Sequence, residues 1–491
     1  MKINLDNVNW NFDNSYINLP KILMTKTNPT PVLQPNLEML NIDLAKELDL
    51  NIEQLDRKKL SLLFSGNKLP SGSNCIAQAY AGHQFGNFTN LGDGRAILLG
   101  EHINKKNNRF DIQFKGSGKT AYSRNGDGRA ALGPMLREYI ISEAMYGLNI
   151  PTTRSLAVVS TGEDVIRERI YKGAILTRVA SSHLRIGTFQ FLGMQKDISS
   201  LKKIVDYTLN RHYSNIYKKE NQSLLLLEGL MEKQISLIIN WMRVGFIHGV
   251  MNTDNMSMCG ETIDYGPCAF MNHYDPSQVY SSIDYQKRYS FSNQELICHW
   301  NLSRFAETLL PLFADNENKA IEIGTEIINS FSKKFKKKWL SMMKKKLGFL
   351  GSFPEDEKFI YKFLSWMNKY QADYTNTFLF LINNKSISTN IYKDASFKDI
   401  YEEWLKRTNK NNLPKTVWIN IMKENNPIFI PRNHIVEKAL LNASEKNDFE
   451  ELNELSNLVK SPYDHNKTIK SKYLIPPSLN ESIKYQTFCG T

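Results

Sequence analysis

The feature that most constrains this chain is a polar loop that directly follows a long apolar segment. The apolar segment covers residues 224–244 and is expected to be a helix. The loop behind it carries His248 and, seven positions later, Asn255, and Asp264-Tyr265-Gly266 follows shortly afterwards. An amide oxygen and a carboxylate are ligands that favour magnesium or manganese over zinc. The pattern therefore predicts a metal site between Asn255 and Asp264.

The spacing of this loop matches the catalytic loop of protein kinases, with one substitution. Kinases read His-x-Asp-x-x-x-x-Asn and then Asp-Phe-Gly, and the first Asp accepts the proton of the substrate hydroxyl. Val250 stands at the position of that Asp and can neither accept a proton nor bind a metal. Asp254 is the only carboxylate between His248 and Asn255. We therefore expect Asp254 to act as the base, and the transferred group to differ from that of a kinase.

Upstream of this loop, glycines and short apolar runs predict a small sheet with one helix. Lys115 ends an expected strand, and Glu138 lies on the helix that follows. A strand lysine paired with a helix glutamate is the arrangement with which kinases hold nucleotide phosphates. A surface lysine and a solvated glutamate would be the alternative. The expected strands cover residues 96–101, 110–115, 155–160 and 174–179, and the expected helix covers residues 134–147.

Two glycine-rich turns and two arginines are further candidates for a nucleotide site. Glycines in tight turns let backbone N–H groups approach phosphate oxygens, and guanidinium groups bind phosphate through two parallel hydrogen bonds. Most such turns are only turns, and either arginine could equally form a structural ion pair. The candidates are Gly92, Gly94 and Arg95 in the first turn, Asp127 and Gly128 in the second, and Arg178 and Arg185.

Helices are expected to dominate from about residue 200 onward. Residues 296–313 and 319–347 are predicted helices, and residues 37–50 near the N-terminus are predicted to form an amphipathic helix. The expected fold class is α+β, with the two lobes of a protein kinase. We expect an N-terminal extension (1–75), an N-lobe with nucleotide-binding loops (76–190), a helical C-lobe with the catalytic and metal-binding loops (191–460) and a C-terminal tail (461–491).

Composition narrows the class of protein. The hydrophobic fraction of 41% and the charged fraction of 23% are ordinary for a globular protein. Five scattered cysteines without a Cys-x-x-Cys pair argue against a zinc site and a disulfide framework. The N-terminus has no signal or transit pattern, and no apolar run approaches the ~20 residues of a membrane span. A cytoplasmic protein without a membrane partner is expected.

The net charge of +12 suits a polyanionic ligand such as a nucleotide. Lysine is common throughout the chain, so this excess also fits a general compositional bias. Nucleic acid is not an expected partner, because no aromatic–basic RNA motif occurs. Nothing in the pattern demands a dimer, and a monomer is expected.

Four segments together resemble the selenoprotein O family, and the similarity runs through nearly the whole chain. The resemblance implies a kinase-like fold that was long described as a pseudokinase. It also implies that the protein binds ATP in a reversed orientation and transfers AMP to Ser, Thr or Tyr hydroxyls of proteins, with release of pyrophosphate. The segments are residues 77–86, the segment around Lys115, residues 247–255 and residues 426–434.

The resemblance also implies a role for each candidate residue. Lys115 and Glu138 would form the ion pair, Asn255 and Asp264 would bind Mg²⁺ or Mn²⁺, and Asp254 would accept the proton. ATP and hydroxyl-bearing proteins are the implied partners. The residues implied for the nucleotide site are Gly92, Gly94, Arg95, Lys115, Asp127, Gly128, Arg178, Arg185 and Asp264.

Members of this family often carry a selenocysteine or cysteine near the C-terminus that is linked to redox control, and Cys489 lies there. A regulatory disulfide to Cys268 or Cys259 is one hypothesis, and a free thiol is the other. Two other activities remain open. One is kinase-type phosphotransfer with Asp254 replacing the displaced base, and the other is a non-catalytic nucleotide-binding scaffold. The joint presence of a base and two metal ligands argues against the scaffold.

Overall fold

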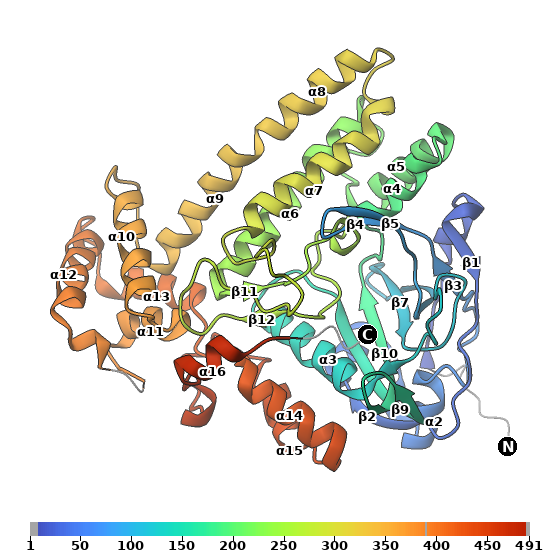
Figure 1. The fold of residues 1–491 in the computed structure, drawn as a ribbon, viewed down its shortest axis with the longest axis horizontal. Coiled ribbons are helices and arrows are strands. Elements are labelled where there is room, and N and C mark those ends of the chain that lie inside the picture. The colour runs from blue at the N-terminus through green and yellow to red at the C-terminus, as the bar shows by residue number, and fades with distance from the viewer. Residues whose placement is uncertain (1–7, 388–389, 488–491) are drawn as a thin grey trace.

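An antiparallel sheet of eight strands forms the centre of the N-terminal part of the protein (Figure 1). The computed structural model describes residues 8–387 and 390–487. The strand order is β1-β3-β6-β7-β10-β9-β2, and β8 pairs with β10. The strands are β1 (Met24–Lys26), β2 (Asn36–Leu40), β3 (Ile76–Gln78), β6 (Ala96–Ile103), β7 (Arg109–Lys115), β8 (Ala130–Ala131), β9 (Arg154–Ile166) and β10 (Ile170–Ala180). Both ends of this order, β1 and β2, come from the first 75 residues.

The sheet is covered on both faces. The alternation of side chains along its strands determines which residues lie on the side of α3. On one face Ile112 and Phe114 pack in a core with α2 (Arg57–Phe64). On the other face α3 (Leu132–Gly147) packs against β9 and β10. Because successive side chains of a strand point to opposite faces, Gln113 and Lys115 of β7 lie on the α3 side.

The C-terminal part is helical, and its largest helix, α6, leads into the loop that carries His248. Two short hairpins accompany the helices: β4 (Ala81–Gln84) pairs with β5 (Asn87–Asn90), and β11 (Phe246–Ile247) pairs with β12 (Ala269–Phe270). The helices are α4 (Ile186–Met194), α5 (Ile198–His212), α6 (Gln222–Val244), α7 (Gln294–Leu309), α8 (Glu317–Asn329), α9 (Phe331–Lys346), α10 (Asp356–Lys369), α11 (Tyr374–Asn383), α12 (Ala395–Asn409), α13 (Lys415–Asn425), α14 (Asn433–Lys446), α15 (Glu450–Leu458) and α16 (Leu479–Lys484). This arrangement of a sheet-based part beside a helical part confirms the predicted α+β class.

Two late helices return to the sheet-based part. Val436 and Ala439 of α14 and Leu452 of α15 share a buried core with Leu136 and Ile140 of α3. Figure 1 shows α14 and α15 beside α3, although most of the helical part of the chain lies between them in the sequence. The helix that carries Glu138 is therefore held between the sheet and the C-terminal helices.

Most predicted elements coincide with observed ones, and two predictions were wrong. The expected helix at residues 37–50 is divided into β2, which pairs with β9, and α1 (Ile42–Glu47). Asn41 separates them, because its side-chain oxygen accepts the Leu44 N–H at 3.0 Å and caps α1. The expected helix at residues 319–347 is two helices, α8 and α9, which meet at Ser330. The Ser330 hydroxyl donates to the Ile327 carbonyl at 2.7 Å.

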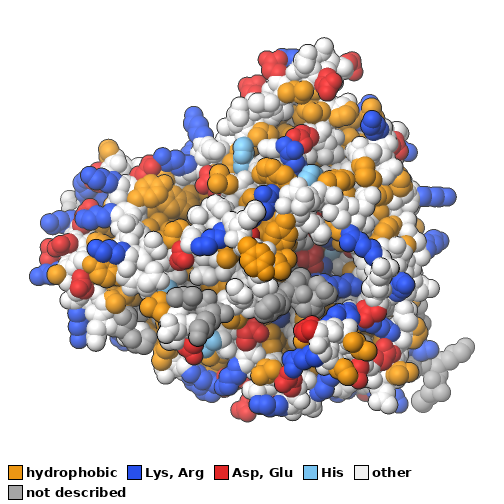
Figure 2. All heavy atoms as spheres, in the orientation of Figure 1, with side chains coloured by type: hydrophobic (Ala, Val, Ile, Leu, Met, Phe, Trp, Pro, Cys, Tyr) orange, Lys and Arg blue, Asp and Glu red, His pale blue; other side chains and the backbone are white. Residues whose placement is uncertain are grey.

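Short 3₁₀ turns connect several of these elements. They are η2 (Ser15–Asn18), η3 (Lys21–Leu23), η4 (Ile52–Gln54), η5 (Thr253–Asn255), η6 (Leu310–Leu312), η7 (Ile391–Lys393) and η8 (Ser471–Tyr473). Among the described residues, no helix combines the length and the apolar character that a bilayer crossing requires. On the face shown in Figure 2, Lys and Arg side chains are interspersed with Asp and Glu.

Candidate active site

A buried cluster of opposite charges joins the sheet to the loop at Asp264. The Lys115 ammonium group donates to Glu138 Oε2 at 2.7 Å and to Asp264 Oδ1 at 2.9 Å. Lys115 comes from the end of β7, Glu138 from α3 and Asp264 from the segment between β11 and β12. Residues that are 149 positions apart therefore meet through one ammonium group.

Two arginines complete this cluster. Arg178 of β10 donates through Nε to Glu138 Oε1 at 2.7 Å and through Nη2 to Asp264 Oδ1 at 2.6 Å. Arg185, which precedes α4, places Nη1 3.5 Å from Asp264 Oδ2 and donates from the same nitrogen to the backbone carbonyl of Asp254 at 3.1 Å. Its guanidinium also lies 4.3 Å from the centre of the Tyr80 ring. Arg185 thus links the Asp264 loop to the Asp254 loop.

The positive charges of the cluster determine the ionisation of Glu138 and Asp264. Burial disfavours the charged forms, but Arg178 and Lys115 outweigh it and hold the pKa of Glu138 below its ordinary value. Arg178, Lys115 and Arg185 together hold the pKa of Asp264 well below its ordinary value against the same burial penalty. Both groups are therefore carboxylates at neutral pH.

The His248 loop is held by its own backbone and by the segment that follows. Val250 N–H donates to His248 Nδ1 at 3.4 Å, so the ring proton lies on Nε2, which donates to the Ile263 carbonyl at 2.9 Å. Burial also lowers the pKa of His248, which keeps the ring neutral. His248 is thus a structural tie between its own loop and the residue before Asp264.

Asp254 occupies an unusual position for a charged side chain. It is 7% exposed, and its Oδ1 has no hydrogen-bond partner among the described residues. Burial raises its pKa to about 6, although Arg185 opposes this shift. A buried carboxyl group with a free oxygen and a pKa close to neutrality can accept a proton from a substrate hydroxyl.

Close backbone packing holds Asp254 in place. Gly82 of β4 lies so near that a Cβ atom there would be 2.3 Å from Asp254 Oδ1. Gly187 of α4 packs equally tightly, since a Cβ there would lie 2.0 Å from the Ala81 carbonyl oxygen. Both glycines are required because no side chain fits between β4, α4 and the loop. Gly82 belongs to the segment 77–86 that the sequence analysis singled out.

Asn255 and Asp264 fit the donor set of a hard divalent cation. Asn255 Nδ2 donates to the Val250 carbonyl at 2.9 Å, which leaves Asn255 Oδ1 as an acceptor. Asp264 Oδ1 receives Lys115 and Arg178, whereas Oδ2 faces only Arg185 at 3.5 Å. The described residues contain no group of three or more His, Cys, Asp or Glu that could hold a metal by itself. A bound Mg²⁺ would therefore take its remaining ligands from phosphate and water.

The first glycine-rich turn lies next to Lys115. Ala96, which follows Arg95, is paired with Lys115 across the β6–β7 ladder. Gly92 has φ +140°, and a Cβ there would be 2.5 Å from the Tyr122 ring, so the turn tolerates no side chain at this position. At Gly94 a Cβ would lie 2.9 Å from the Tyr122 carbonyl oxygen.

The second glycine-rich turn is not joined to the charge cluster by any contact that we find in the described residues. Asp127 forms a two-point ion pair with Arg167, with both N–O distances 2.9 Å. This arginine holds the pKa of Asp127 below its ordinary value. Gly128 packs on the Gly118 backbone, where a Cβ would lie 2.1 Å from the carbonyl oxygen.

Two further residues of the site were missed by the sequence analysis. Asp93 Oδ2 accepts from the Gln78 N–H at 3.1 Å and from Gln113 Nε2 at 3.3 Å, and Gln113 Oε1 accepts from Arg178 at 3.3 Å. Burial raises the pKa of Asp93 to about 6. The signal for Gln113 was its position two residues before Lys115, which places both on the same face of β7. For Asp93 the sequence offered only a polar residue between two glycines.

Comparison with known proteins identifies the family. The family model described as "Protein adenylyltransferase SelO" matches residues 6–460. The chain belongs to the SelO family. It is 54% identical over 484 residues to the "Protein nucleotidyltransferase YdiU" of Pelagibacter ubique, which covers 99% of this chain and 100% of that protein. The YdiU of Nitrosococcus oceani is 53% identical over 485 residues, covering 99% of this chain and 98% of that protein.

SelO membership makes the chain a nucleotidyltransferase. Among solved structures, ROP2 from Toxoplasma gondii, described as a virulence factor with a protein-kinase fold and no enzymatic activity, overlaps with a TM-score of 0.24 and 8% identity. That overlap covers 67% of this chain and 86% of that chain. A similarity of this size carries no argument, and the fold description rests on the elements above.

The segment 426–434 that contributed to the SelO resemblance contacts β12, which follows the loop that carries Asp264. Asn433 Oδ1 accepts from the Phe270 N–H at 3.2 Å, and its Nδ2 donates to the Phe270 carbonyl at 2.9 Å, so it fastens β12. Arg432 is buried and donates to Asp373 Oδ2 at 2.8 Å. Cys489 lies outside the described residues. Its pairing with Cys268 or Cys259 stays a prediction.

Proposed function

We propose that this SelO-family chain transfers AMP from ATP to Ser, Thr or Tyr hydroxyls of proteins and releases pyrophosphate. The observation that carries this proposal is the position of Asp254. Its buried carboxyl group has a free oxygen beside a charge cluster, in a loop where Val250 has replaced the base of a kinase. The matched family model and the YdiU relatives, which are named for the same class of transfer, support it.

The positive side chains of the cluster would bind the phosphates. Arg178 and Arg185 offer guanidinium donors that suit phosphate oxygens, and Lys115 adds a point charge. Glu138 contacts both Lys115 and Arg178 and therefore orients them. The glycine turn at Gly92 and Gly94 lies next to Lys115 and would allow close approach of the nucleotide.

Asn255 and Asp264 would hold Mg²⁺ or Mn²⁺ through Oδ1 and Oδ2, the oxygens that their other contacts leave available. When bound, the cation would neutralise charge that develops on the phosphoryl group during transfer. Asp264 is fixed for this task in the left-handed region, with φ +60°, where an aspartate persists only if its surroundings hold it. Lys115 and the two arginines supply that support.

Asp254 would accept the proton of the attacking hydroxyl. The attack on the α-phosphorus forms the new O–P bond, and the bond to the pyrophosphate leaving group breaks. Asp254 is suited to this step because its carboxylate is buried and its Oδ1 is free of hydrogen bonds. A kinase-type transfer would also have to use Asp254, because Val250, at the position of the kinase base, has no titratable group.

Pyrophosphate release tests this proposal. A reaction with ATP, Mg²⁺ and a protein acceptor should release pyrophosphate in step with modification of the acceptor. Release of orthophosphate or ADP in step with modification would instead indicate kinase-type transfer. A reaction that modifies no protein while the chain still binds ATP would favour the scaffold.

A further inference from the structure

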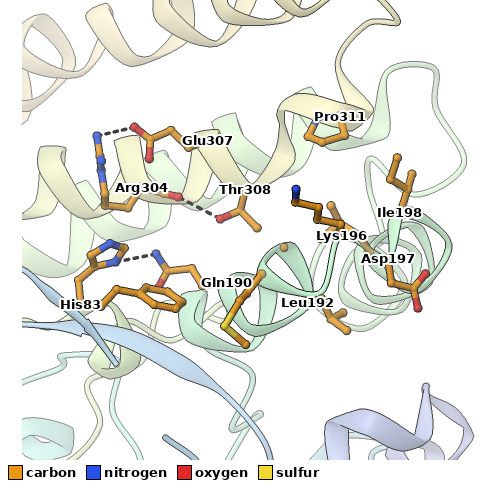
Figure 3. Close-up of a pocket in the computed structure, with 14 residues that line it drawn as sticks. His83, Gln190, Leu192, Lys196, Asp197, Ile198, Arg304, Glu307, Thr308 and Pro311 are labelled. Atoms are coloured by element: carbon orange, nitrogen blue, oxygen red, sulfur yellow. Dashed lines mark hydrogen bonds and ion pairs between the residues drawn. The ribbon is translucent and has the colours of Figure 1, made fainter. Parts of the chain in front are cut away.

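An apolar pocket lies on the surface beside the Asp254 loop. It has a volume of about 380 Å³ and is bounded by α4, the start of α5, α7 and the β4–β5 hairpin (Figure 3). This volume is at the lower end of the range for ligand sites, so it fits a side chain or a short segment and not a folded domain. None of the residues that line it belongs to the charge cluster.

Two hydrogen bonds connect the inner wall of this pocket to Thr253, the residue before Asp254, and a third joins the two wall residues to each other. His83 N–H donates to the Thr253 hydroxyl at 2.8 Å, and that hydroxyl donates to Gln190 Oε1 at 2.7 Å. Gln190 Nε2 in turn donates to His83 Nδ1 at 3.0 Å, as Figure 3 shows. His83 and Gln190 line the pocket, and Gly82, next to His83, packs against the Asp254 carboxylate. The pocket lining is thus directly connected to the residues that pack around Asp254.

Large apolar side chains at this pocket are left exposed to solvent. Phe88 of β5 is 45% exposed, Met194 at the end of α4 is 40% exposed, and Ile198 at the start of α5 is 46% exposed. All three line the same pocket. Exposed apolar residues that gather in one hollow are typical of a binding surface, whereas single ones are not informative.

Two cations, Lys196 in the pocket lining and Arg288 beside it, lack an ion-pair partner within the part of the chain that the structure describes. Lys196 lines the pocket, and Figure 3 shows its ammonium group extended toward Thr308. The Arg288 guanidinium lies 4.8 Å from the centre of the Trp300 ring, and this ring contacts His83 edge-on at 5.2 Å. The two cations therefore have free charge for a ligand.

Of the two acidic groups that line the pocket, Glu307 is paired with Arg304, whereas Asp197, among the described residues, accepts hydrogen bonds only and keeps its negative charge. Asp197 caps α5, because its carboxylate accepts from the Ser200 N–H at 3.0 Å and from the Ser200 hydroxyl. Glu307 forms an ion pair with Arg304, drawn as a dashed line in Figure 3. Burial lowers the pKa of His83, and the positive charges of Arg304 and Arg288 lower it further. Lys196 and Arg288 against Asp197 leave an excess of positive charge in and beside the pocket, which an occupant with negative charge would complement.

We propose that this pocket binds the protein acceptor, by seating an apolar side chain of a segment whose flanking residues are acidic and which carries the hydroxyl that receives AMP. The proposal rests on the proposed function for the transfer itself. The apolar floor would take the side chain, and Lys196 and Arg288 would pair with the acidic flanks. Because His83 of the pocket lining contacts Thr253, which directly precedes Asp254, a segment anchored there would lie near the base.

Binding of a designed peptide tests this proposal without requiring transfer. The probe is a fluorescent peptide with one tyrosine, one leucine and four glutamates, measured by anisotropy with a non-transferable ATP analogue and Mg²⁺. The control peptide has the same length and the opposite charge, with lysine in place of each glutamate. Lys196→Glu should weaken binding of the acidic peptide about tenfold, which corresponds to ~1.4 kcal/mol. Lys58→Glu makes the same charge change on α2 and should leave binding unaltered.

A second variant examines the apolar floor. Met194→Asp should weaken the acidic peptide, whereas Leu33→Asp, at an 80% exposed position away from the pocket, should not. In transfer assays Lys196→Glu should raise KM for the acidic peptide and leave kcat and KM for ATP unchanged. A role that is merely structural would change all three values together.

Each result decides the proposal. Equal binding by Lys196→Glu and Lys58→Glu would overturn it, as would preference for the lysine peptide. Displacement of the peptide by a short RNA at lower concentration would also overturn it, in favour of a nucleic-acid surface. If the wild type binds the acidic peptide through Lys196 but transfers nothing to any acceptor, the docking surface stands and the proposed function fails.

Discussion

The side-chain amide of Asn255 donates to the backbone carbonyl of Val250 at 2.9 Å, so the residue that replaced the kinase base holds a proposed metal ligand. Val250 contributes no side-chain chemistry, and its main chain still defines the loop. The carboxylate that we propose as the base stands at Asp254, directly before Asn255. The hydrogen bond therefore joins the start of the loop to the residue next to the proposed base.

Replacing Asp254 tests its assignment as the base. Asp254→Asn keeps the shape of the side chain but cannot accept a proton at neutral pH. We expect kcat to fall by ~10²–10⁴-fold, the usual contribution of a positioned base, with ATP affinity nearly unchanged in equilibrium binding. Glu295→Gln on α7 is the control, since burial also raises the pKa of this carboxyl group and it lies outside the site. It should affect kcat far less. A large loss of ATP affinity in Asp254→Asn would contradict the assignment.

Glu138 is expected to stabilise the fold as well as the site. Glu138→Gln leaves the Lys115 and Arg178 cations buried with one carboxylate fewer, and their side chains are only 8% and 3% exposed. Breaking a buried ion pair on one side costs ~3–5 kcal/mol of unfolding free energy. Glu322→Gln, at an exposed pair with Lys319 on α8, should cost ~1 kcal/mol or less. Denaturant titration measures both variants.

Glu138→Gln should also change how the unfolding free energy depends on pH. The pKa of Glu138 is lowered in the folded state from an ordinary value of 4.5. The stability that this group contributes is therefore complete above pH 4.5 and is lost as the pH falls through the folded pKa. Wild-type protein should lose unfolding free energy more steeply below that pH than Glu138→Gln. Parallel curves would show that Glu138 is not paired in the folded state.

Metal removal should abolish transfer without destabilising the free protein. Chelation with EDTA removes the cation that Asn255 and Asp264 would hold together with nucleotide phosphates. Because the described residues contain no three-ligand His, Cys, Asp or Glu group, we expect the melting temperature without nucleotide to stay the same. Mg²⁺ or Mn²⁺ should restore transfer. A fall in the melting temperature on chelation alone would indicate a structural metal site instead.

The contact of Thr487, the last described residue, favours Cys268 over Cys259 as the disulfide partner of Cys489. Thr487, two positions before Cys489, donates through its hydroxyl to the Pro267 carbonyl at 2.9 Å. Treatment with diamide, which accepts the two electrons and two protons of the thiols, should produce a Cys268–Cys489 peptide under non-reducing mass spectrometry. Burial raises the pKa of Cys268 to about 12, so the reaction should be slow at neutral pH. A Cys489 that stays free, or pairs with Cys259, would contradict this prediction.

The sequence predicted those parts of the site that follow from local order along the chain. A strand ending in Lys115 followed by a helix with Glu138 leaves few ways to arrange the two, and the structure contains their ion pair. Asp93 could not be predicted, because its role depends on Gln78 and Gln113 from two other strands. The sequence alone also gave no sign of the pocket beside Asp254.

Long-range packing explains why other parts of the fold differ from what the sequence predicted. The association of α14 and α15 with α3 joins residues about three hundred positions apart and leaves no periodic signal in either segment. The predicted helix at residues 37–50 failed because pairing of β2 with β9 overrode local helical periodicity. Contacts of this kind depend on how the whole core packs, and a local sequence pattern does not contain that information.

The position of the label from ATP on a protein acceptor tests the central claim most directly. ATP labelled on the α-phosphate and ATP labelled on the γ-phosphate are compared, each with Mg²⁺ and the same acceptor. We predict that protein is labelled only from the α-position, and that Asp254→Asn abolishes this label. Label from the γ-position alone would show kinase-type transfer despite Val250, and it would contradict the assignment of Asp254 as the base for transfer of AMP.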